Sequence, residues 1–97
     1  MELNSKTRKL LEKYAHDIQP VVIVGGNGIS DALKQKVCAE LDAHELIKVK
    51  FNDFKDEKKV LSERLAKDCG AFLVRVIGNI AILYKQNEDP SKRSFKI

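Results

Sequence analysis

The feature that most constrains the fold is residues 21–30, where an apolar run passes directly into a glycine-rich loop. The run Val21-Val22-Ile23-Val24 is rich in β-branched side chains and predicts a short strand buried on both faces. The next residues, Gly25-Gly26-Asn27-Gly28, are of types that tolerate a positive φ and let another backbone approach closely. Ser30 is the expected N-cap of a helix. We therefore expect a strand, a glycine loop and a helix in succession.

Such a loop lies between a strand end and a helix N-terminus, where backbone N–H groups and the helix dipole favour an anion. Three of its four positions have no side chain, so a sugar-phosphate backbone could lie against it. The alternative is a tight strand-to-helix turn that needs glycine only for its geometry. The glycines alone favour neither interpretation.

Composition indicates a single soluble globular domain. The chain has 97 residues, of which 43% are hydrophobic and 33% are charged. Its net charge of +4 is moderately basic, which suggests a polyanionic partner. The longest apolar run is too short for a membrane span and the N-terminus lacks a signal-peptide pattern, so we expect a cytoplasmic protein without membrane contact.

The cysteines and histidines do not form a recognisable site. Cys38 and Cys69 lie in apolar helical patterns, with no C-x-x-C and no histidine at ligand spacing. We expect both cysteines to be small buried side chains in a reducing compartment. His16 and His44 are isolated, so no metal site is predicted.

Apolar periodicity predicts further elements on both sides of the glycine loop. Helical spacing indicates helices over residues 4–17, 30–44 and 56–68. Alternation indicates a strand over residues 46–51, and Gly78-Asn79 joins strands 71–77 and 80–85 as a hairpin. The strand–helix–strand unit favours a parallel pair, whereas the hairpin must be antiparallel. The prediction is an α/β fold (α+β, two-layer), in the order α-β-α-β-α-β-β around a four-stranded mixed sheet. The sequence leaves open whether the first helix covers part of the second face.

Basic residues near the loop are candidates for phosphate contacts. Lys48 and Lys50 alternate with the apolar residues of their strand, which places both on the face opposite the core. Lysines on an edge strand also protect against aggregation, and this pair alone does not exclude that role. Lys34 lies within a turn of the loop. The aperiodic residues 87–97 are predicted to be a flexible basic tail that follows a single domain over residues 1–86.

Enzyme signatures are not found. The loop is not a P-loop, because no Lys-Ser or Lys-Thr follows its last glycine, and it does not read G-x-G-x-x-G. The predicted elements bring together no Ser, His and Asp or Cys and His set. We therefore predict no catalysis and no cofactor. The few aromatic residues do not cluster, so recognition of structured RNA by backbone and shape fits better than base stacking.

Several motifs together resemble the bacterial YhbY family, a single CRM (chloroplast RNA splicing and ribosome maturation) domain. They are Gln19-Pro20-Val21-Val22 with the glycine loop, His44-Glu45-Leu46-Ile47-Lys48-Val49-Lys50, Val76-Ile77-Gly78 and Leu83-Tyr84-Lys85. The resemblance implies RNA binding, association with large ribosomal subunit precursors, and a fold similar to the C-terminal domain of translation initiation factor three. It also implies that the loop and adjacent basic surface contact RNA. Lys85 stands where the family often has arginine, which removes a planar fork for phosphate.

We therefore predict a non-enzymatic, monomeric RNA-binding module that acts in assembly of the large ribosomal subunit and takes no small-molecule substrate. The alternative is a protein-interaction adaptor that docks on a ribosome-associated factor through the open sheet face. The residues predicted to contact ribosomal RNA are Gly25, Gly26, Asn27, Gly28, Lys34, Lys48, Lys50 and Lys85.

Overall fold

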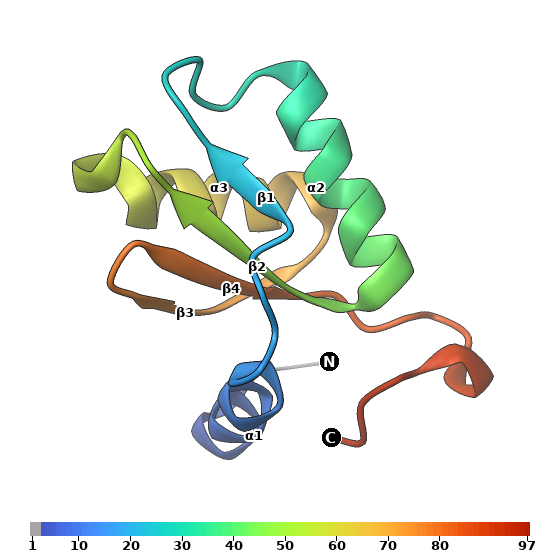
Figure 1. Ribbon diagram of the computed structural model, residues 1–97. Helices are drawn as coiled ribbons and strands as arrows, with labels where there is room; N and C mark the ends of the chain where they lie inside the picture. Colours follow the sequence, from blue (N-terminus) through green and yellow to red (C-terminus); the bar gives the residue numbers. More distant parts are fainter. Residues whose placement is uncertain (1–2) are drawn as a thin grey trace.

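Four strands form a single mixed sheet in the order β1-β2-β4-β3, in a computed structural model that describes residues 3–97 (Figure 1). The strands are β1 (Val22–Val24), β2 (Leu46–Phe51), β3 (Phe72–Ile77) and β4 (Ile80–Tyr84). β1 runs parallel to β2, whereas β4 is antiparallel to both β2 and β3. The predicted order of elements and the predicted mixed sheet are confirmed.

The helices begin and end at the residues that cap them. They are α1 (Ser5–Ala15), α2 (Asp31–His44) and α3 (Lys58–Cys69), and the 3₁₀ turn η1 (Lys55–Glu57) precedes α3. Asn4 Oδ1 accepts the Thr7 N–H at 2.8 Å, and Ser30 Oγ accepts the Leu33 N–H at 3.1 Å. Gly70 ends α3 in the left-handed conformation, with φ 69°.

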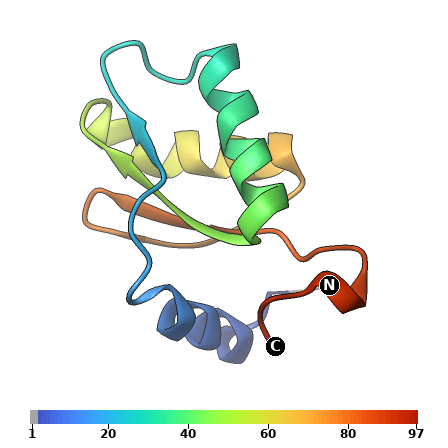
Figure 2. The same cartoon turned by 45° about the vertical axis from the view of Figure 1, so that its right-hand side comes forward.

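Helices α2 and α3 pack on one face of the sheet and enclose the larger part of the core (Figures 1 and 2). This face presents the alternate residues Ile47, Val49 and Phe51 of β2, all fully buried. Burial of large aliphatic and aromatic side chains is the main stabilising contribution in a domain of this size. The other buried members of this cluster are Val22, Val24, Val37, Leu41, Leu65, Ala66, Cys69, Ala81 and Leu83.

Helix α1 lies on the opposite face and covers only part of it. Leu11 and Ala15 pack there with residues from β2, β3 and β4, namely Leu46, Val74, Ile82 and Tyr84. The Arg8 guanidinium donates hydrogen bonds to the carbonyl oxygens of Leu73, at 2.7 Å, and Val74, at the irregularity in the β3–β4 register. This pairing fixes α1 over the end of the sheet where β2 begins, and the end where β2 finishes stays open.

The open end corrects the prediction that β1 is buried on both faces. Val22 and Val24 are buried, but the side chain of Ile23 between them points to the other face and is 55% exposed. β-Branched residues predict a strand from backbone preference, and that preference does not depend on whether a helix covers the second face. Here α1 lies over the far end of the sheet, so Ile23 stays uncovered.

The cysteines also differ from the prediction, because Cys38 and Cys69 form a disulfide. Cys38 lies midway along α2 and Cys69 is the last residue of α3, with their Cα atoms 5.1 Å apart. Their 31-residue separation gives no local signal of pairing. Packing of the two helices side by side on the sheet brings the sulfurs together.

The C-terminal segment lies against the same end of the sheet as α1. Glu45 joins α2 to β2 with a positive φ of 65°, and its buried carboxylate accepts the backbone N–H groups of Asn87 and Ser94. Phe95 packs against Tyr14 of α1, with ring centroids 5.3 Å apart. The segment also forms a 3₁₀ turn, η2 (Pro90–Lys92). The flexibility expected for residues 87–97 stays a prediction, and these contacts are the ones that such motion would break.

Tyr84 should make the stability of the fold sensitive to alkaline pH. Burial raises the pKa of its hydroxyl above the usual value, and the negative charge of Glu45 adds to the shift. Because the unfolded chain ionises first, the stabilisation is complete below about pH 10 and is lost as the pH rises through the folded pKa. We expect urea unfolding to show a steeper loss of stability between pH 9 and pH 11 for the native sequence than for Tyr84→Phe. Parallel pH profiles of the two proteins would contradict this assignment.

Candidate nucleic-acid interface

The glycine loop forms a tight turn between β1 and α2. The Gly28 N–H donates to the Gly25 carbonyl at 3.0 Å, and Gly28 has a φ of 64°. A Cβ at Gly28 would lie 3.3 Å from Cε2 of Phe54, a tight contact. Positive φ and close packing therefore both favour glycine at this position.

Gly25 and Gly26 are different, because the fold does not require glycine at either position. Neither has a positive φ. A Cβ at Gly25 would meet no atom within 4 Å, and one at Gly26 would make only ordinary contact with Asp53 Oδ2 at 3.7 Å. An interpretation of the loop as a turn that needs glycine only for geometry explains Gly28 and leaves these two unexplained. Their missing side chains keep the outer surface of the loop open to another molecule.

The segment between β2 and η1 supports the loop from one side. The Val24 carbonyl accepts the N–H groups of Asn52, at 3.0 Å, and Asp53, at 3.2 Å. Phe54 has a left-handed φ of 54°, its N–H donates to Asp53 Oδ1 at 2.8 Å, and its ring faces Gly28. Sequence reasoning missed Phe54, since an isolated aromatic residue in a loop carries no periodic signal. A carboxylate on this flank means that an anion would approach the loop from another side.

Lys50 and Lys48 lie on the open face of the sheet next to the loop. Lys50 pairs with Ile23 across β1 and β2, two residues before the loop begins, and is exposed. Lys48 lies two residues further from the loop along β2 and is half-buried, and its Nζ donates to the His16 carbonyl at 3.4 Å. The predicted alternation is thus present, with both ammonium groups on the face opposite the α2–α3 core.

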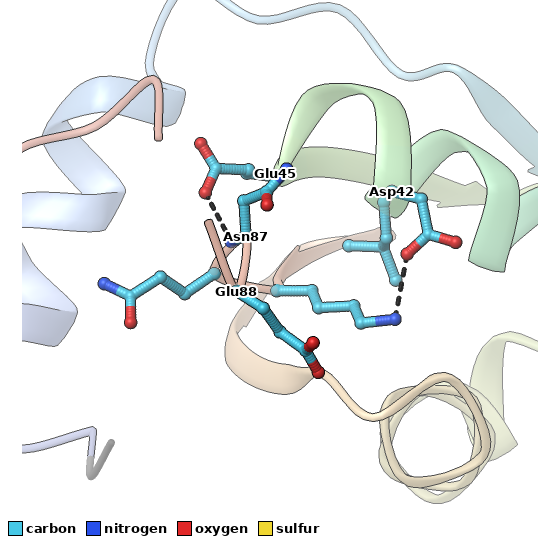
Figure 3. Close-up of a pocket in the computed structure, with 7 residues that line it drawn as sticks. Asp42, Glu45, Asn87 and Glu88 are labelled. Carbon is cyan, nitrogen blue, oxygen red and sulfur yellow. Dashed lines mark hydrogen bonds and ion pairs between the residues drawn. The ribbon is translucent and has the colours of Figure 1, made fainter. Parts of the chain in front are cut away.

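Lys34 and Lys85 both have carboxylate partners. Lys34 is in the first turn of α2, and its Nζ lies 3.8 Å from Asp68 of α3. Lys85 follows β4 and its Nζ lies 2.8 Å from Asp42 (Figure 3, dashed line to Asp42). Because Tyr84 pairs with Leu46 at the start of β2, Lys85 lies at the end of the sheet opposite the loop. The structure therefore brings Lys50 and Lys48 near the glycine loop, and it does not bring Lys85 there.

A pocket of about 260 Å³ beside Lys85 does not resemble a phosphate site. Asp42, Glu45 and Glu88 contribute to its wall, and the Glu45 carboxylate is engaged with the N–H of Asn87 (Figure 3). Three carboxylates repel an anion. Within residues 3–97 we find no group of three or more His, Cys, Asp or Glu side chains suited to a metal ion. None of the helices formed by these residues is long and apolar enough to cross a membrane.

Comparison with known proteins gives consistent matches over nearly the whole chain. A model of the CRS1/YhbY (CRM) domain matches residues 3–85. An RNA-binding protein of Haemophilus influenzae is 33% identical over 88 residues, which are 90% of this chain and 89% of that protein. The Bacillus subtilis protein YqeI, named a probable RNA-binding protein, is 33% identical over 90% of this chain and 92% of its own. The solution structure of SAV1595 from Staphylococcus aureus, suggested to be an RNA-binding protein, has a TM-score of 0.79 and 31% identity, over 98% of this chain and 100% of that one.

Proposed function

This chain belongs to the CRS1/YhbY (CRM) domain family, and from that premise we propose that it binds structured ribosomal RNA through the glycine loop and the adjacent lysines of β2. Two relatives that match along nearly their whole length carry RNA-binding names, which supports RNA as the partner. The basic net charge of +4 is in keeping with a polyanionic ligand.

The observation that carries this proposal is the absence of side chains at Gly25 and Gly26 where the fold would accept them. A sugar-phosphate backbone needs close approach to a protein main chain if backbone N–H groups are to contact phosphate oxygens. A methyl group at either position would hold that backbone away from the loop. Recognition of a ligand explains these two glycines, whereas turn geometry does not.

Electrostatics favours one side of the loop for this contact. Asp53 flanks Gly26 on the side of the β2–η1 segment, whereas Lys50 and Lys48 lie on the open face of the sheet. A phosphate chain that leaves the loop over the open face would meet these two ammonium groups in succession. Lys34 and Lys85 would each have to exchange a carboxylate partner for a phosphate, so we propose them as secondary contacts.

We further propose that the RNA belongs to precursors of the large ribosomal subunit. In this proposal the protein acts as a cytoplasmic monomer, binds RNA without catalysing a reaction, and contributes to ribosome assembly. Association with such particles should then depend on RNA and disappear after ribonuclease treatment.

The double variant Gly25→Ala, Gly26→Ala tests the proposal. Because neither position has a positive φ, we expect its free energy of unfolding to match that of the native sequence or exceed it by up to about 1 kcal/mol. We expect its affinity for ribosomal RNA fragments to fall at least about fivefold, which fluorescence anisotropy would measure. If about five phosphates are neutralised, log K against log salt should slope by about −3 to −5 for the native protein.

Gly70→Ala is the matched control. Its φ of 69° makes alanine unfavourable, so this variant should lose about 1 kcal/mol of stability. It should bind RNA normally, because Gly70 ends α3 away from the glycine loop and a Cβ there would make only ordinary contact with Lys85 Cε, at 3.9 Å, which leaves that secondary contact in place. On sucrose gradients of cell extracts, the double variant should leave the large-subunit precursor fractions and Gly70→Ala should remain there. Native RNA affinity in the folded double variant would refute the close-approach role of the loop.

A further inference from the structure

A row of isoleucines crosses the open face of the sheet at the end nearest the glycine loop. The strand register pairs Ile23 of β1 with Lys50 of β2, Lys50 with Ile80 of β4, and Ile80 with Ile77 of β3. Side chains paired in this way point to the same face. Ile23 is 55% exposed and Ile77 is 50% exposed, with Ile80 half-buried between them and α1. We call these three side chains the isoleucine row.

A groove lies beside the row, where the C-terminal end of α1 approaches the sheet. It has a volume of about 240 Å³, and Ile77, Ile80 and Ile82 form its apolar floor. Glu12 and Ala15 of α1, with His16 that follows it, form one wall, and Lys48 borders the groove. The Glu12 carboxylate is paired with Arg75, whose Nη1 donates to Glu12 Oε1 at 2.7 Å. The groove is therefore continuous with the isoleucine row, through Ile77 and Ile80, and with Lys48 of the proposed RNA surface.

We propose that the isoleucine row and this groove hold the bases of unpaired nucleotides, so that the segment of the structured RNA recognised here is a single-stranded one, such as a loop or bulge. This inference rests on the proposed function, because the glycine loop and the lysines would hold the phosphates of the same segment. In a duplex the bases are stacked within the helix, and only an unpaired segment can turn its base faces towards a protein. Aliphatic side chains offer the apolar contact that an unstacked base lacks in water.

The position of the lysines favours a nucleic acid over a protein as the occupant. Lys50 stands within the row, between Ile23 and Ile80, and Lys48 borders the groove. Charged residues are depleted at the centre of protein–protein interfaces, because a lysine there must lose its hydration. A nucleotide strand supplies an apolar base face for each isoleucine and a phosphate for each ammonium group. Lys50, which pairs with both Ile23 and Ile80, and Lys48, which pairs with Ile82, therefore place an ammonium group for a phosphate next to an apolar contact for a base.

Three RNA probes separate base contacts from phosphate contacts. They are a single strand of about ten nucleotides, the same strand in a duplex, and an abasic strand of equal length that keeps every phosphate. We expect Ile77→Ser to weaken binding of the single strand at least fivefold, to leave duplex and abasic binding within about twofold, and to keep the salt slope. Lys50→Gln should weaken binding of all three probes and reduce the salt slope by about 1.

Two further variants keep the test decisive. Ile23→Ser removes a row member from a different strand and should reproduce the effect if Ile77→Ser folds poorly. Val60→Ser is the matched control, because Val60 is 60% exposed on α3, outside the row. Equal binding of the three probes by the native protein would overturn the base-binding role and leave the proposed function standing. Failure of the native protein to bind any of the three probes would refute the proposed function itself. Normal single-strand binding by both folded isoleucine variants would also overturn the inference and would favour a protein partner for this face.

Discussion

Removal of the Cys38–Cys69 disulfide is expected to lower the free energy of unfolding by about 3–4 kcal/mol. The bond closes a loop of 31 residues, and a cross-link of this span removes conformational entropy from the unfolded chain. It also joins α2 to α3, which both pack on the same face of the sheet. For a domain of this size, such a change corresponds to a fall in Tm of at least about 10 °C.

Urea unfolding with and without a reducing agent measures this contribution. The double variant Cys38→Ala, Cys69→Ala should be slightly less stable than the reduced native protein, because it also loses the packing of the Cys69 sulfur, which is largely buried. Oxidised and reduced native protein with the same midpoint would contradict the expected contribution. The added reductant should not change the midpoint of the double variant, which controls for effects of the reagent.

The disulfide has a consequence for the proposed cytoplasmic location. Reducing compartments keep most protein thiols unpaired. There packing alone would hold α2 against α3, and the protein would have the lower stability of the reduced form. Trapping of free thiols in intact cells by a maleimide reagent reports directly which form is present.

The fold was predictable to the extent that it rests on local patterns. Capping by Ser30, the left-handed Gly70 and the Gly78-Asn79 hairpin all follow from conformational preferences of single residues. The parallel pairing of β1 with β2 follows from their crossover helix. What depended on tertiary packing was not predictable. The exposure of Ile23 depends on where α1 lies, and the pairing of Cys38 with Cys69 depends on how two helices pack.

The candidate site also has features that the sequence predicts and features that only the structure reveals. The glycine loop and the alternation of Lys48 with Lys50 could be identified from the sequence, because each is a property of a short segment. Only the structure separates Gly28, where the backbone conformation and Phe54 favour glycine, from Gly25 and Gly26, where the fold would accept a side chain. Lys85 shares a positive charge with the other candidate lysines, but it does not lie near them, because the direction of β4 places it at the far end of the sheet.

The buried carboxylate of Glu45 is the clearest example of a feature that the sequence could not predict. In the sequence it is one charged residue within a motif, and nothing in the pattern indicates that its side chain turns inward. In the structure its carboxylate is buried and accepts two backbone N–H groups from the C-terminal segment, at Asn87 and Ser94. A buried carboxylate needs such partners, and they come from residues more than 40 positions away. A pattern confined to a short window cannot contain them.

A single negative charge in the glycine loop is expected to reduce RNA affinity at least tenfold. In Gly28→Asp, a carboxylate would stand at the end of the loop next to the N-terminus of α2, where a phosphate is proposed to bind. Two unit charges at about 4 Å repel each other by several kcal/mol at an intermediate effective dielectric, and salt reduces this value. A tenfold loss corresponds to only about 1.4 kcal/mol, so much of the repulsion can be screened without hiding the effect.

Gly28→Asn separates charge from shape. Asparagine and aspartate have nearly the same size and both tolerate a left-handed φ better than most residues, so both variants should meet Phe54 alike and lose similar stability, about 1 kcal/mol. Thermal unfolding would verify this equality before RNA titration at low and high salt. We expect the affinity difference between the two variants to narrow as salt increases, because the repulsion is screened. Equal affinities of the two folded variants at low salt would place the phosphate away from Gly28 and confine the contact to Gly25, Gly26 and the lysines of β2.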